Sequence, residues 1–119
     1  MDNNFQFPVT VEQLFQEASQ LELYKALIHQ LSKDFTLANS EISLDENMLP
    51  DQVFKTVQDK IYSLLHYNFA AYLSLLYVVD VPESLIKKLD GSDFVELSYQ
   101  ISFLILKREW QKVWFKKYF

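Results

Sequence analysis

Apolar residues recur at intervals of three and four over most of this chain, which is the spacing of one face of an α-helix. Between residues 20 and 36 the stripe consists of Leu21, Tyr24, Leu27, Ile28, Leu31 and Phe35. The segment 11–36 is therefore predicted to be helical. It forms either one helix or two, over 11–18 and 20–36, because Ser19 and Glu22 have the spacing of a second N-terminal capping box.

A polar and partly acidic stretch without helical spacing covers residues 37–49, and we predict that it is the longest loop. Pro50 follows this stretch, and proline is favoured in the first turn of a helix. An apolar stripe continues from Pro50 to Leu65. Asn68 is expected to cap the next helix. Residues 69–79 are apolar on nearly all sides, which is typical of a helix at the centre of the core or at an interface, and we predict the central position.

Two further helices are expected in the last third of the chain. The first is short, from Pro82 to Leu89, with Gly91 available for the left-handed residue that ends many helices. Asp93 then marks the start of a final helix that meets no helix-breaking residue before Tyr118. At 1.5 Å per residue this helix is about 39 Å long, enough to span a domain of this size.

The composition supports a helical fold. The chain has 119 residues, half of them apolar, with one glycine, three prolines and no cysteine. A β-rich fold needs many tight turns, and these turns need glycine. We therefore predict an all-α protein: a compact single-domain bundle of five or six helices over residues 1–119, with a loose lead-in over 1–9 and a long C-terminal helix. Without cysteine, no disulfide and no thiolate-bound metal is possible.

Little in the sequence indicates catalysis. The two histidines, His29 and His66, lie outside any metal-ligand motif, and one glycine cannot form a phosphate-binding loop. A helix-turn-helix over 83–102 would bring acidic residues to the DNA phosphates, which opposes binding. We expect no catalytic residue, no cofactor and no metal site, and hence a non-enzymatic protein.

The last 13 residues, 107–119, stand out from the rest by their charge. They carry a formal charge of +4, whereas residues 1–106 carry −9. The candidate contacts for an anion are Lys112, Lys116 and Lys117. Such contacts would suit RNA, DNA or an anionic membrane surface. The same lysines also complement the dipole at a helix C-terminus without any partner. We therefore expect neither nucleic acid nor a membrane surface as the main partner.

Aromatic residues are also concentrated in this segment. The candidate interface consists of Trp110, Trp114, Phe115, Tyr118 and Phe119. Tryptophan and tyrosine are common at the centres of protein interfaces. The alternative is that these rings continue the apolar stripe of the last helix and belong to the core.

These observations favour a small soluble protein-interaction module that self-associates or binds a protein partner of unknown identity. The N-terminus lacks the basic and apolar regions of a secretory signal, so we expect a cytoplasmic location. The chain broadly resembles small helical proteins of bacteria, but no motif in it ties it to a named family.

Overall fold

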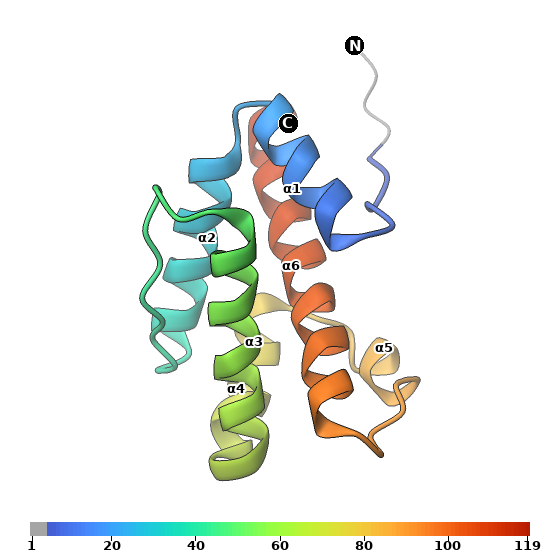
Figure 1. The fold of residues 1–119 in the computed structure, drawn as a ribbon. Helices are drawn as coiled ribbons and strands as arrows, with labels where there is room; N and C mark the ends of the chain where they lie inside the picture. Colours follow the sequence, from blue (N-terminus) through green and yellow to red (C-terminus); the bar gives the residue numbers. More distant parts are fainter. Residues whose placement is uncertain (1–4) are drawn as a thin grey trace.

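The computed structural model describes residues 5–119, which form six α-helices and the segments that connect them (Figure 1). In chain order they are α1 (Val11–Gln20), α2 (Tyr24–Leu37), α3 (Pro50–Tyr67), α4 (Phe69–Val79), α5 (Glu83–Lys87) and α6 (Phe94–Tyr118). No strand occurs among these residues. The predicted all-α bundle with a long C-terminal helix is confirmed.

The N-terminal helical segment is divided in two, as one of the two alternatives predicted. The break lies between α1 and α2, where Glu22 adopts a left-handed backbone conformation with φ of 60°. The N–H group of Leu23 donates to the carbonyl of Ala18 at 2.7 Å and so closes the turn. Leu23 is the N-cap of α2 and provides no side-chain acceptor, so the capping box expected at Ser19 does not start α2.

Helices α3 and α6 run in opposite directions along the length of the molecule, and α1, α2 and α4 pack against α6 as well (Figure 1). The fully buried core includes Leu14, Leu31, Phe35, Ile61, Ile105 and Trp110. Each such side chain stabilises the fold by about 1.5–3 kcal/mol relative to an exposed one. The molecule extends over 43 × 29 × 23 Å, so the 25 residues of α6 span most of its longest dimension.

Helix α4 is peripheral, and the prediction that it lies at the centre of the core was wrong. Its inner face consists of Tyr72, Leu75 and Val79, which are buried. Its outer face carries Phe69, Leu73 and Tyr77, which are exposed. The sequence shows only that α4 is apolar, whereas its position depends on which neighbours cover it. Helices α2, α3 and α6 cover one side only.

Asp80 has a left-handed backbone conformation, whereas Gly91, for which this conformation was predicted, does not. Asp80 ends α4 with φ of 72° and ψ of 52°, and its N–H group donates to the carbonyl of Leu76 at 2.9 Å. Aspartate tolerates this conformation better than most residues with a side chain. Gly91 has a negative φ, so the prediction that it supplies a left-handed cap was wrong.

The loop between α2 and α3 lies along α2, on the left in Figure 1. Ile42, Leu44 and Met48 are half-buried against the core, and the hydroxyl of Tyr24 donates to the carbonyl of Met48. This attachment holds Glu46, which is in the same loop, beside α2. Among the described residues, no helix combines the length and the apolar character needed to cross a bilayer.

Candidate functional site

The five aromatic residues proposed as interface contacts lie in different environments. Trp110 is fully buried in the core, and Trp114 and Tyr118 are half-buried against it. Phe115 and Phe119 are exposed, by 36% and 71%. Most of this aromatic surface is therefore covered by the chain itself.

Part of that cover comes from the N-terminal segment, which was expected to be a loose lead-in. The ring of Phe5 lies 5.3 Å from that of Trp114 and 5.7 Å from that of Phe115, measured between centroids. Pro8 is buried. From residue 5 onward the lead-in therefore packs on the end of α6, and residues 1–4 lie outside the described part of the chain.

The three lysines proposed as anion contacts also differ from one another. Lys112 already has two acidic neighbours: its Nζ lies 2.8 Å from Oδ2 of Asp34 and 3.2 Å from Oε1 of Glu109. Lys116 donates to the side-chain oxygen of Gln30 at 3.0 Å. Lys117 is exposed and makes no ion pair within residues 5–119. Of these three lysines, Lys116 and Lys117 are therefore the two that can contact an external anion.

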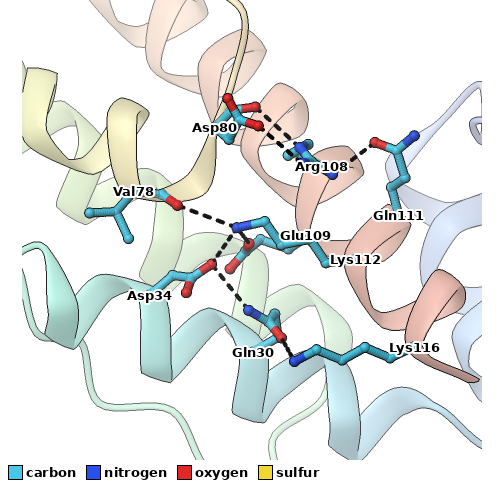
Figure 2. A network of polar contacts seen from close by, with 9 residues as sticks. All are labelled: Gln30, Asp34, Val78, Asp80, Arg108, Glu109, Gln111, Lys112 and Lys116. Carbon is cyan, nitrogen blue, oxygen red and sulfur yellow. Dashed lines mark hydrogen bonds and ion pairs between the residues drawn. The ribbon is translucent and has the colours of Figure 1, made fainter.

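The surroundings of Lys112 form a buried polar cluster at the junction of α2, α4 and α6, which Figure 2 shows from close by. Lys112 also donates to the carbonyl of Val78, and Gln30 donates to Oδ2 of Asp34 at 3.2 Å. Asp34 is 4% exposed and Glu109 is completely buried. This cluster links side chains that are 78 residues apart in the sequence.

The two carboxyl groups of the cluster have opposite pKa shifts. Burial, together with the nearby Asp34, raises the pKa of Glu109 to about 9 and outweighs the opposing effect of Lys112. Burial alone would also raise the pKa of Asp34, but hydrogen bonds from Glu109, Lys112 and Gln30 hold it below its usual value. At neutral pH Glu109 is therefore protonated and neutral, while Asp34 and Lys112 form an ion pair.

A second polar link joins α4 to α6 nearby. Arg108 donates through Nη2 to Oδ2 of Asp80 and through Nε to the carbonyl of the same residue, each at 3.1 Å. Arg108 thus engages both the side chain and the backbone of the residue that ends α4 (Figure 2). The guanidinium group also donates to Gln111 at 3.1 Å.

The buried acids were not predicted from the sequence, although their positions carried a signal. Asp34 and Glu109 both occupy places in otherwise apolar helical stripes, next to Phe35 and Trp110. A lone acidic residue on a buried stripe must be neutral or paired. The two histidines take no part in the cluster: His29 contacts Glu46, and the ring of His66 lies against that of Phe94.

The cluster links α2, α4 and α6 through the contacts of Lys112. The groove beside it is lined by Gln30 and Lys116 but not by Asp34, Glu109 or Lys112. Within residues 5–119, no group of three histidine or acidic side chains is arranged to hold a metal ion.

The exposed face of α4 carries three large apolar side chains. Phe69, Leu73 and Tyr77 are exposed by 55%, 51% and 86% and follow one another at intervals of four residues. We call these three residues the α4 stripe. The α4 stripe forms part of the lining of a groove of about 630 Å³ between α4, α5 and α6. Leu76, Ile86 and Leu97 contribute to its walls.

Comparisons with protein-family models, with curated proteins and with solved structures found no match to this chain.

Proposed function

We propose that this chain is a non-enzymatic, cytoplasmic protein-interaction module that pairs with a second copy of itself through the α4 stripe. The observation that carries the proposal is the exposure of three large apolar side chains on one helix face beside an apolar groove. Contiguous apolar patches on a small protein commonly mark interaction sites.

The charge pattern favours a second copy as the partner. The whole chain has a net charge of −5, so two copies repel each other over most of their surfaces. No residue from Asn68 to Val79 is charged, so this repulsion is weakest where two α4 helices meet. A twofold axis through this contact would place each α4 stripe against its equivalent.

The structure gives less support to the alternative function, in which the basic aromatic segment 107–119 binds RNA, DNA or a membrane surface. Arg108 and Lys112 are committed to Asp80 and Asp34, and Trp110 is buried where no base or lipid can reach it. Of the five candidate aromatics, Phe115 and Phe119 are the two that are exposed.

Light scattering on the purified chain over a range of concentrations tests this proposal. The wild type should approach the mass of a dimer as its concentration rises, and Leu73→Glu should remain a monomer, because the new charge would be buried in the contact. Leu49→Glu is the matched control, since Leu49 is 66% exposed and lies outside α4. Circular dichroism spectra should show that both variants fold.

A wild-type chain that is strictly monomeric at about 1 mM would overturn the proposal, because even a weak dimer would be populated there. Dimers that form equally well in Leu73→Glu would place the contact elsewhere and would also contradict it.

A further inference from the structure

A second surface, separate from the α4 stripe, combines positive charge with an apolar floor. It is a shallow groove of about 480 Å³ between α2 and the last turns of α6. Leu23, Ala26 and Val113 supply apolar lining, and four lysines lie around them: Lys25, Lys33, Lys116 and Lys117. We call it the basic groove. It shares no residue with the groove beside α4.

The charge of the basic groove is unusual for this chain. Four of the eleven basic residues gather here, with Glu46 as the only acidic residue in the lining, although the chain as a whole is acidic. Lys116 and Lys117 complement the dipole at the C-terminus of α6. This explanation fails for Lys25, which lies in the first turn of α2, where the dipole disfavours a cation.

One carboxylate already sits at the basic groove. Glu46, from the loop between α2 and α3, contacts the ring nitrogen of His29, and its other oxygen lies 4.0 Å from Nζ of Lys25. This part of the groove therefore holds a carboxylate within the molecule. Lys33 and Lys117 have no ion-pair partner within residues 5–119, and Lys116 is bound only by the neutral amide of Gln30.

We infer that the basic groove binds an acidic, amphipathic segment of a partner polypeptide. The carboxylates of the segment would meet Lys33, Lys116 and Lys117, and its apolar side chains would lie on the floor of the groove. A peptide fits better than a nucleic acid, because no phenylalanine, tyrosine or tryptophan lines the groove on which unpaired bases could stack, and its one imidazole, that of His29, already contacts Glu46. The inference does not depend on self-association through α4.

Fluorescence anisotropy with a fluorescein-labelled helical peptide of glutamate and leucine provides the test. The peptide should bind saturably, and its affinity should fall as salt is added. Replacing Lys116 and Lys117 together by glutamine should weaken binding about fivefold, the loss expected for two exposed ion pairs. The matched control replaces Lys87 and Lys88 by glutamine, which removes the same charge from α5 and its C-cap and should change nothing.

The variant Glu46→Gln sharpens the test in the opposite direction. Removal of the internal carboxylate frees Lys25 and His29 for the peptide, so binding should tighten about twofold. The control for this variant is Glu41→Gln, which removes an exposed acid outside the lining. A groove that attracts the peptide by net charge alone would bind it with the same affinity in both variants.

Three results would overturn the inference. The first is no binding of the peptide by the wild type. The second is an equal loss in the two lysine double variants, which would indicate attraction by net charge alone. The third is tighter binding of a labelled oligothymidylate of similar length, which would assign the groove to nucleic acid. The Leu73→Glu variant should bind the peptide normally, so failure here is distinct from failure of self-association.

Discussion

Helix α4 and the second half of α6 are not buried as their compositions would predict: the apolar helix is partly exposed, and the charged segment is partly buried. Helix α4 contains no charged residue, yet it exposes Phe69, Leu73 and Tyr77. The second half of α6 is rich in charge, yet it buries Trp110 and Glu109 completely. The difference arises because α6 packs against α1, α2, α3 and α4, whereas α4 is covered on one side. Burial thus follows from the number of neighbours, and composition alone does not determine it.

The largest expected effect compares one aromatic residue from each region. Trp110→Ala should lower the free energy of unfolding by about 3–5 kcal/mol, because it leaves a cavity in the core. Tyr77→Ala should change it by no more than about 0.5 kcal/mol, since the side chain is 86% exposed. Urea denaturation followed by circular dichroism measures both. Similar losses in the two variants would contradict the assignment of the rings.

A second prediction concerns the ion pair at the centre of the buried cluster. Asp34→Asn should lower the free energy of unfolding by about 2–3 kcal/mol, because it removes the main counter-charge of Lys112. Glu109 limits the loss, since it can ionise and take over that role. Asp59→Asn is the control: it breaks an exposed pair with Lys55 and should have almost no effect. Urea titrations of the two variants distinguish these cases.

The pH dependence of stability reports on the protonation of Glu109. The pKa of Glu109 is raised from 4.5 to about 9, so the folded chain keeps a proton that the unfolded chain releases. The stability linked to this proton is complete below about pH 4.5 and is lost as the pH rises toward 9, by at most about 1.4 kcal/mol per pH unit. Glu109→Gln should abolish most of this slope in urea titrations between pH 5 and 9.

Asp34 acts in a different pH range, so the two carboxyl groups can be distinguished. Its pKa lies below the ordinary value of 3.8, and its contribution is therefore present above that value and lost on further acidification. Glu109→Gln should leave this acid limb in place. A slope above pH 5 that is unchanged in Glu109→Gln would show that another group causes it.

A smaller loss of stability than that of Asp34→Asn is predicted at the start of α4. The side chain of Asn68 accepts a hydrogen bond from the N–H group of Ala71 at 3.1 Å. Asn68→Ala should lower the free energy of unfolding by about 1 kcal/mol, the usual cost of losing an N-cap. Asn47→Ala, in the loop before α3, offers a control outside any helix. Thermal melting of the two variants provides the comparison.

Local signals predicted the helices well because caps and prolines act within a few residues. Pro50 and Asp93 mark the starts of α3 and α6, and Asn68 caps α4 as expected. The site was harder to predict because its parts are far apart in the chain. Asp34 meets Lys112 only when α2 and α6 pack together, and no local pattern encodes that contact.

The faces of the helices were the other limit of sequence analysis. Apolar spacing indicates which residues prefer burial, but a helix that is apolar all round, such as α4, gives no indication of which side faces the core. The α4 stripe and the basic groove both depend on that missing information. Each becomes visible only once the neighbours of α2, α4 and α6 are known.

The short helix α5 makes one wall of the groove beside α4 easier to move than the others. Glu83–Lys87 contains no buried residue, so little free energy opposes its local opening. Amide hydrogen exchange should therefore be faster in α5 than in α3. One wall of the groove can then shift without unfolding the core. The width of the groove can therefore change locally, and the rate of the proposed self-association would depend on this motion.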